Sequence, residues 1–323
     1  SRLASAIIPG NTIIIKPCET SPLSACVLGE IVNGVLPAGV VNIVTGGPAA
    51  GEAIVRHPKI KRIAFIGHAR TGMAIQRTAA EVAVKHVSLE LGGKNPMIIC
   101  PDADLERASA AAVRGMNFAW QGQSCGSTSR LMLHEDVYDT VLPMVLDRIG
   151  KMKAGDPLDP ASSMGPMNSQ MQYDKTMEYI KIAKKDGATL MAGGKRPTGP
   201  EFEKGFWVEP TVFTDVTMDM RIAKEEVFGP VLSVLKWRDI DEVIDMANDV
   251  DYGLTASIWT RDLDLAMRFV KEVEAGYIWV NGTGTHFRNV PHGGFKNSGT
   301  GREEGLDELL SYTEVKAVNI MTG

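Results

Sequence analysis

The sequence predicts an α/β protein of two domains, of which the first is built on a doubly wound parallel sheet. Short β-branched runs alternate with helical stretches over the first ninety residues, and this texture changes at Gly92–Gly93. The chain has 323 residues, 44% of them hydrophobic and 23% charged, which is enough for two folded domains with large cores. Intrinsic disorder is excluded.

The first domain is expected to alternate strand and helix. Residues 11–16 (NTIIIK) suit a strand that is covered on both faces. A helix follows, with Ser21 as N-cap, Pro22 at its first position and Gly34 as its stop. Further elements are a strand at 40–44, a helix at 50–56, a strand at 62–66 and a helix from the 67–72 turn to about residue 85. Such sheets bind ligands at the carboxyl ends of their strands.

One stretch could be mistaken for a membrane span. Residues 31–51 carry no charge over 21 positions, about the length of a spanning helix. Glycines, prolines and asparagines interrupt the stretch throughout, so it is expected to hold a helix end, a strand and turns. No membrane association is therefore predicted.

The second domain is expected to mix helices and strands in the same way. Its helices are predicted near 105–119, 137–151, 169–185 and 241–248, and its strands at 96–99, 130–133, 207–213 and 231–237.

Charge and cysteine content narrow the function classes. The net charge of −5 gives no basic excess for binding nucleic acid or anionic lipid. The four cysteines (Cys18, Cys26, Cys100 and Cys125) have neither CxxC nor zinc-ligand spacing, and the histidines are scattered, so no metal site is expected. Reduced thiols and an opening stretch unlike a signal peptide favour a cytoplasmic protein.

Two segments suggest catalysis. In residues 122–126 (GQSCG), glycines flank Cys125 closely enough for backbone N–H groups to stabilise a thiolate and an oxyanion. A lone loop cysteine is more often structural. In residues 90–94 (ELGGK), Glu90 ends an apolar strand at the domain boundary, where it could act as a general base or form a salt bridge.

Three more segments complete a pattern. Residues 9–19 (PGNTIIIKPCE), 224–230 (KEEVFGP) and 291–299 (PHGGFKNSG) occur with the previous two in the order and spacing typical of one family. By these five motifs the chain resembles the NAD(P)-dependent aldehyde dehydrogenase superfamily over essentially its whole length. The resemblance implies a Rossmann-like cofactor-binding domain at 1–92, incomplete at its amino terminus, and an α/β catalytic domain at 93–296. Residues 297–323 would return to the cofactor domain and supply an oligomerisation strand, giving a homodimer or homotetramer.

The resemblance also implies roles for individual residues. Cys125 matches the nucleophile that forms a thiohemiacetal and then a thioester with an aldehyde substrate, and Glu90 matches the base that activates the hydrolytic water. The expected cofactor is NAD, because Glu19 would repel the 2′-phosphate of NADP. The residues implied in cofactor binding are Lys16, Glu19, Gly67, His68, Gly72, Leu91, Glu226 and Phe228.

This sequence departs from the family pattern in places. Ile66 and His68 stand where hydroxyl residues are common, and Trp120 replaces a common asparagine. The amino-terminal third of the family, with an asparagine that donates to the oxyanion, has no counterpart, which is expected to cost about 10²–10³ in rate.

Two alternatives stay open. A CoA-acylating dehydrogenase would resolve the thioester with CoA, although such relatives usually lack the base at Glu90. A catalytically incomplete fragment could act only as a binding or structural module. Trp120 and Phe287 hint at an aromatic or medium-length aliphatic aldehyde.

Overall fold

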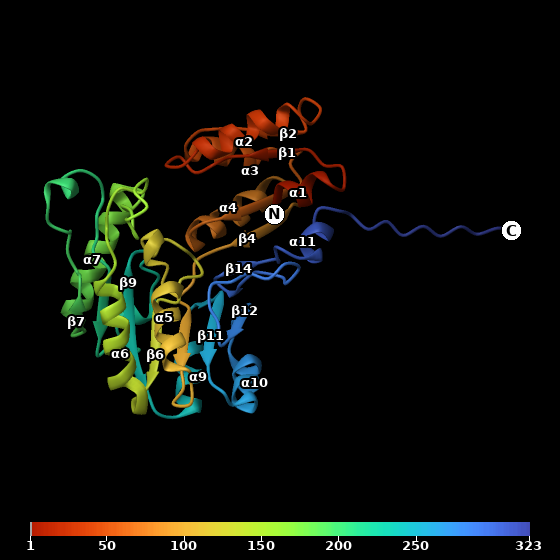
Figure 1. The fold of residues 1–323 in the computed structure, drawn as a ribbon. Helices are drawn as coiled ribbons and strands as arrows, with labels where there is room; N and C mark the ends of the chain where they lie inside the picture. Colours follow the sequence, from red (N-terminus) through yellow and green to blue (C-terminus); the bar gives the residue numbers. More distant parts are fainter. Residues whose placement is uncertain (1) are drawn as a thin grey trace. The chain divides into compact units, whose positions relative to one another are not determined.

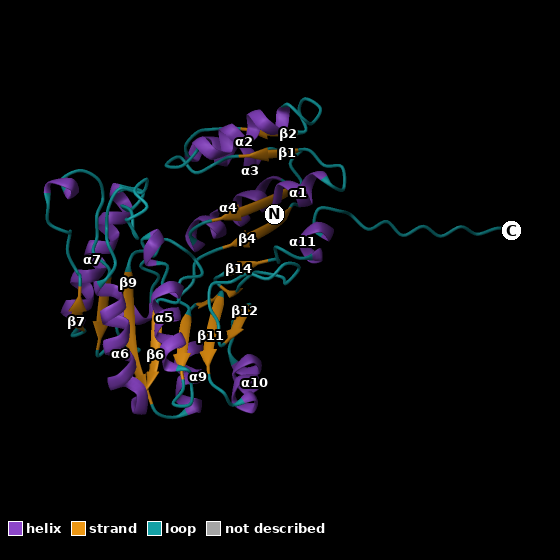
Figure 2. Cartoon of the chain, in the orientation of Figure 1, coloured by secondary structure: helices purple, strands orange, loops and turns teal. Residues whose placement is uncertain are grey.

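The computed structural model describes residues 2–323, which divide into two compact units. The first unit comprises the chain up to Glu90 together with His286–Gly293 and Thr300–Gly323. The second comprises Leu91–Thr285 and Gly294–Gly299. Both units combine helices with mainly parallel strands, so the α/β class predicted from the sequence is confirmed (Figure 2).

The first unit alternates strands and helices along the chain (Figure 1). Its elements are α1 (Arg2–Ile7), β1 (Ile13–Ile15), α2 (Leu23–Asn33), β2 (Val41–Ile43), α3 (Pro48–Arg56), β3 (Arg62–Ile66), α4 (Ala69–Val82), β4 (His86–Glu90) and α11 (Leu306–Leu310). Strand β1 pairs in parallel with β2, and β3 pairs in parallel with β4, which also borders β14 (Gly299–Thr300).

The ends of helix α2 can be compared with the capping residues predicted from the sequence. The Pro22 carbonyl accepts the Cys26 N–H at 3.1 Å, so the helical bonding begins at the predicted proline. No side-chain cap is found at this end among the described residues, so the predicted cap at Ser21 is wrong. The helix stops at Gly34, whose φ of −77° is right-handed, so the stop does not use glycine's left-handed freedom.

The uncharged stretch at 31–51 holds the end of α2, all of β2 and the start of α3. Among residues 2–323, no helix is both long and apolar enough to cross a membrane.

The second unit is organised around a large sheet, which has seven strands within the described residues. Its helices are α5 (Leu105–Gly115), α6 (Glu135–Gly150), α7 (Gln170–Asp186), α8 (Arg221–Lys224), α9 (Ile240–Asn248) and α10 (Leu263–Glu272), with short 3₁₀ turns η1 (Phe118–Trp120) and η2 (Pro200–Phe202). Its strands are β5 (Pro96–Ile99), β6 (Arg130–His134), β7 (Thr189–Ala192), β8 (Thr211–Thr214), β9 (Val231–Trp237), β10 (Tyr252–Gly253), β11 (Thr255–Trp259), β12 (Tyr277–Val280) and β13 (Phe295–Lys296).

The strand order is β12-β11-β5-β6-β9-β8-β7, and every pairing is parallel except the one between β7 and β8. Alternate side chains of β5 enter two separate cores. Met97 and Ile99 pack with residues of α5 and α6, whereas Ile98 packs with residues of α7, α9 and α10. The sheet is therefore covered on both faces, which explains its nearly continuous apolar strands.

The register of the parallel strands gathers distant segments at one edge. Pro96 of β5 lies opposite Arg130 of β6, which lies opposite Ser233 of β9. The loops that enter these strands therefore meet at their amino ends. These loops contain the three motifs around Gly92, Cys125 and Glu226.

Candidate active site

Cys125 lies in the loop between η1 and β6, in a backbone held by unusual conformations. Asn117 and Gln121 have φ of 56° and 58°, a left-handed region that non-glycine residues seldom adopt. Gly122 has φ of +63°, and a Cβ there would collide with the Gly229 carbonyl. Strain of this kind is often stored at functional sites.

Asn95, just before β5, anchors this loop. Its Nδ2 donates to the Cys125 carbonyl at 2.7 Å and to the Ser127 carbonyl at 2.9 Å. Its Oδ1 accepts the Thr255 N–H at 3.0 Å. Asn95 is buried, and its hydrogen bonds join the cysteine loop to the amino ends of β5 and β11.

Glu226 lies against the two glycines that follow Glu90 in the sequence. Its Oε1 accepts the Gly93 N–H at 2.9 Å, and a Cβ on Gly92 would collide with its carboxylate. Burial raises the pKa of Glu226. Phe228, two residues further along the chain, has a left-handed φ of 56°. It directly precedes Gly229, whose carbonyl lies against Gly122.

A small cleft opens where these segments meet. The residues that line it are Gly93, Met116, Gly122, Ser124, Ser127, Ser129, Glu226, Val227, Phe228, Gly229 and Val231. The structure thus brings Glu226 and Phe228 to the same cleft as Ser124, the neighbour of Cys125.

Two cations lie buried beneath this edge. Arg130 donates to the carbonyls of Lys94, Met246 and Ala247, which satisfies its guanidinium within the fold. The Lys94 ammonium has no hydrogen-bond partner among the described residues. Burial, reinforced by the Arg130 charge, lowers the pKa of Lys94 to about 7.

In the first unit, Lys16 and Glu19 follow β1 and contact each other. Lys16 Nζ donates to Glu19 Oε1 at 2.8 Å and to the Pro17 carbonyl at 3.1 Å. The hydrogen bond from Lys16 lowers the pKa of Glu19. The structure therefore places both residues together at the carboxyl end of a parallel strand.

The turn from β3 into α4 contains Gly67, His68 and Gly72. The Gly67 N–H donates to the Glu90 carbonyl at 3.1 Å, and a Cβ on Gly67 would lie 2.5 Å from the Phe65 ring. His68 caps the helix, since its Nδ1 accepts the Arg70 N–H at 3.2 Å. The imidazole takes the capping role that a serine or threonine hydroxyl commonly fills.

Glu90 ends β4, and its side chain is buried. Within residues 2–323 its carboxylate oxygens accept no hydrogen bond, although His292 Nδ1 lies 3.5 Å from Oε2. Leu91, the next residue, is buried and donates its N–H to the Ser298 carbonyl at 2.8 Å.

The predicted residues thus fall into two groups. Cys125, Leu91, Glu226 and Phe228 belong to the second unit, and the other six belong to the first. Among residues 2–323, no group of three His, Cys, Asp or Glu side chains could hold a metal ion. Trp120, one of the departures from the family pattern, is 67% exposed.

No role was predicted from the sequence for Asn95, Lys94 or His292. Asn95 and Lys94 lie inside the ELGGKN segment, where a charge and an amide directly before a fully buried strand were the available signal. His292 lies inside the PHGGF segment, where an ionisable side chain precedes two glycines.

Comparisons with known proteins agree on one family. The family model described as "Aldehyde dehydrogenase family" matches residues 1–318. The chain is 48% identical to "Aldehyde dehydrogenase tropH" of Talaromyces stipitatus and 45% identical to human "Retinaldehyde dehydrogenase 3", over all of its own length in both cases. It spans 63% and 62%, respectively, of the length of those relatives.

Solved structures give the same fold. A NAD-dependent aldehyde dehydrogenase from Sinorhizobium meliloti superposes with a TM-score of 0.95 at 38% identity, covering 99% of this chain and 63% of that one. Betaine aldehyde dehydrogenase from Staphylococcus aureus, in complex with NAD⁺, superposes with a TM-score of 0.93 at 36% identity, covering 96% and 63%. A 3,6-anhydro-L-galactose dehydrogenase in complex with NAP superposes with a TM-score of 0.94 at 43% identity, covering 97% and 65%.

Proposed function

This chain belongs to the aldehyde dehydrogenase family, and from that premise we propose that the protein oxidises an aldehyde to a carboxylate with NAD and water. The observation that carries the proposal is the anchored cysteine loop. Asn95 holds the carbonyls of Cys125 and Ser127 at 2.7 and 2.9 Å, so the sulfur is carried on a fixed backbone.

Cys125 is the proposed nucleophile. Its thiolate would attack the carbonyl carbon of the aldehyde to form a thiohemiacetal. Loss of a hydride from that adduct leaves a thioester on the sulfur. A fixed loop supports this role because catalysis depends on near-attack geometry.

Glu90 is the proposed general base. Its carboxylate would take a proton from water, and the resulting hydroxide would add to the thioester carbonyl. The C–S bond then breaks, the carboxylic acid leaves and the Cys125 thiolate is restored. Glu90 is buried, and within residues 2–323 its Oε1 has neither a hydrogen bond nor an ion pair, so this oxygen can accept a hydrogen bond from water. This base favours hydrolysis over acyl transfer to CoA.

The residues present fit a bound NAD. Lys16 and Glu19, already paired, are proposed to hold the adenosine ribose. The turn at Gly67, His68 and Gly72 is proposed to receive the pyrophosphate, because the first turn of α4 contains no acidic residue.

On the nicotinamide side, Glu226 is proposed to accept from the ribose, with Phe228 and Leu91 packing nearby. Bound NAD supplies the hydride acceptor for the oxidation. The first unit is thus the proposed cofactor-binding domain, and the second is the proposed catalytic domain.

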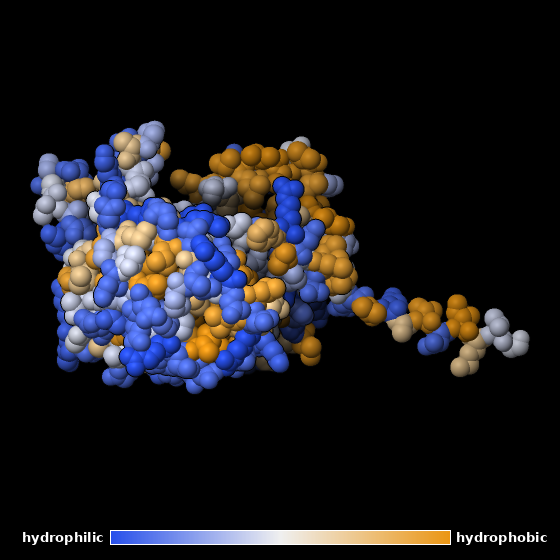
Figure 3. Space-filling view, turned by 60° about the horizontal axis from the view of Figure 1, so that its bottom comes forward, coloured by the Kyte–Doolittle hydropathy of each residue, from blue (hydrophilic) through white to orange (hydrophobic). Residues whose placement is uncertain are grey.

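The intact protein is proposed to be a homodimer or homotetramer in the cytoplasm. After α11 the chain continues as an extended tail whose apolar side chains are exposed (Figure 3). These side chains are Val315, Val318, Ile320 and Met321. A neighbouring subunit's sheet edge could cover them by strand addition.

The test follows NADH absorbance with short, long and aromatic aldehydes, in the presence of NAD or NADP. Cys125→Ala should abolish NADH formation, whereas the matched variant Cys26→Ala, at a half-buried position of α2, should retain it. NADH formation that survives in Cys125→Ala would contradict the proposal.

A further inference from the structure

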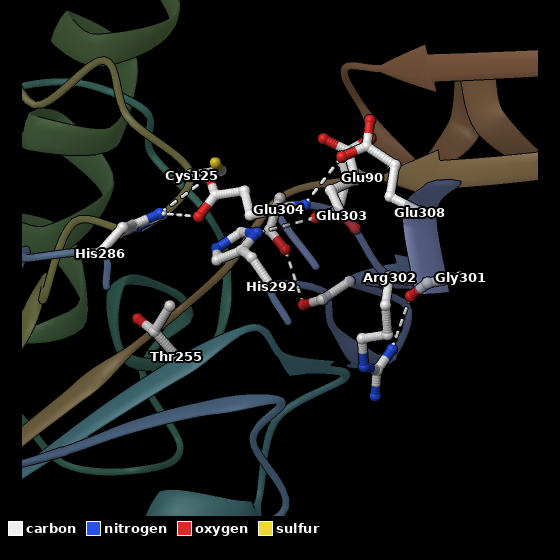
Figure 4. A network of polar contacts seen from close by, with 12 residues as sticks. Glu90, Cys125, Thr255, His286, His292, Gly301, Arg302, Glu303, Glu304 and Glu308 are labelled. Carbon is white, nitrogen blue, oxygen red and sulfur yellow. Dashed lines mark hydrogen bonds and ion pairs between the residues drawn. The ribbon is translucent and has the colours of Figure 1, made fainter. Parts of the chain in front are cut away.

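His292 belongs to a cluster of ionisable side chains around Glu90 (Figure 4). Its Nδ1 lies 3.5 Å from Glu90 Oε2, and its side chain is only 10% exposed. Its ring stacks on the ring of His286, with centroids 4.7 Å apart and planes inclined by 24°. His286 Nδ1 in turn lies 2.9 Å from Glu304 Oε2.

The backbone fixes His292 in this position. Its N–H donates to the Glu303 carbonyl at 2.8 Å, and its carbonyl accepts the Glu303 N–H at 2.7 Å. The Glu303 side chain is paired with Arg2. A Cβ on Gly293 would lie 3.0 Å from Glu90 Oε1, so glycine permits the close approach of this segment to the carboxylate.

Negative charges predominate around the imidazole. Glu90 contacts it from β4, and Glu303 and Glu304 approach it from the segment before α11. Farther out, Arg2 pairs with Glu303, and the buried Glu308 of α11 accepts the Glu304 N–H at 2.9 Å. His286 is the other ionisable ring in contact, and two stacked imidazolium ions would repel each other.

The balance of these effects favours the charged form of His292 more than solvent does. Burial opposes the positive charge, but contact with Glu90 and the charges of Glu304 and Glu303 outweigh burial and raise the pKa of His292. When His292 is protonated, its imidazolium and the Glu90 carboxylate therefore form a buried ion pair.

We propose that His292 is a positioning residue for Glu90, whose carboxylate it holds in an ion pair when protonated and releases when deprotonated. The inference rests on the proposed role of Glu90 as the base. A carboxylate paired with a cation is a weaker base than one that is unpaired. Hydrolysis of the thioester on Cys125 should therefore quicken as the pH rises and His292 loses its proton to solvent.

The first test needs no catalysis. The ring resonances of the six histidines of the whole protein are titrated by NMR, with assignment by His→Gln variants. His292 should titrate above 6.5, and Glu90→Gln should lower its midpoint. His86, which lies on strand β4 with Glu90, is the internal control. Burial lowers the pKa of His86, and Glu90→Gln should leave that pKa unchanged. A His292 midpoint that does not respond to Glu90→Gln would overturn the ion pair.

The second test measures hydrolysis. The enzyme is mixed with propanal and NAD, quenched at intervals, and the fraction carrying an acyl group is followed by intact-protein mass spectrometry. In the wild type the decay rate should rise about tenfold per pH unit below the His292 midpoint and level off above it. In His292→Gln this rise should be absent, whereas His57→Gln, at the surface of the same unit, should keep it.

A rise that persists in His292→Gln would show that His292 does not control the base and would overturn the proposal. His292→Asn guards against a folding defect in the first variant, and circular dichroism checks both. The wild type could form no acyl adduct even though the His292 midpoint responds to Glu90→Gln. In that case the proposed function is wrong, and so is the role of His292 in hydrolysis. The ion pair itself would stand.

Discussion

Replacing Asn95 by alanine should destabilise the cysteine loop. The substitution removes hydrogen bonds of 2.7, 2.9 and 3.0 Å to the backbone of Cys125, Ser127 and Thr255. Each such bond contributes about 0.5–1.5 kcal/mol net, so the loss should reach about 2–4 kcal/mol in the free energy of unfolding.

The loop should also lose its fixed geometry. A displacement of about 1 Å at a nucleophile can cost about 10²-fold in rate, so kcat should fall by about that factor. Urea unfolding measures the stability, and steady-state NADH formation measures kcat. The rate of Cys125 alkylation by iodoacetamide, read by peptide mapping, reports on the loop without turnover.

Asn248→Ala is the matched control. Asn248 donates to the Glu272 carbonyl at 2.9 Å and accepts the Glu274 N–H at 2.8 Å, so its loss should destabilise the same unit. It should leave kcat and Cys125 alkylation nearly unchanged. Equal kcat values in the two variants would refute the role assigned to Asn95.

Three further measurements have defined outcomes. Because burial lowers the pKa of Lys94 to about 7, the unfolded chain binds a proton that the folded protein lacks above that pH. The unfolding free energy of the wild type should therefore rise relative to Lys94→Met by up to about 1.4 kcal/mol per pH unit above neutrality, and parallel pH curves would contradict this. Glu19→Gln should lower the kcat/KM preference for NAD over NADP by roughly tenfold or more, since it removes repulsion of a 2′-phosphate, and an unchanged ratio in coenzyme titrations would count against it. Cys100, whose pKa burial raises to about 12, should resist iodoacetamide at neutral pH in the native protein and react in urea, as peptide mapping would show.

The elements that were predicted correctly are those formed by a distinctive run of neighbouring residues. Strands β3, β5 and β9 coincide with β-branched or apolar runs bounded by turns. Strand β11 (TASIW) was not predicted. Its polar and apolar residues alternate over the first four positions, but all five residues are buried, so the run is short and lacks the apolar, β-branched character of the other strands. The two-residue strands β10 and β13 exist only through their mutual pairing across more than forty residues, which no local pattern reveals.

The candidate site divides in the same way. Cys125 and Glu226 lie in short sequence motifs, so both residues could be predicted from their immediate neighbours. The partners of Asn95 lie 30, 32 and 160 residues away, and the parallel register of the sheet brings them together. His292 contacts Glu90 only in the folded unit. The contacts of Asn95 and of His292 therefore could not be predicted from the spacing of residues in the sequence.

The most direct test of the proposed chemistry is to trap the thioester. Glu90→Gln is incubated with propanal and NAD, and the protein is digested and mapped by mass spectrometry. A propionyl group should accumulate on the peptide containing Cys125, and the double variant with Cys125→Ala should carry none. An adduct on another cysteine, or no adduct while NADH is formed, would contradict the proposed chemistry.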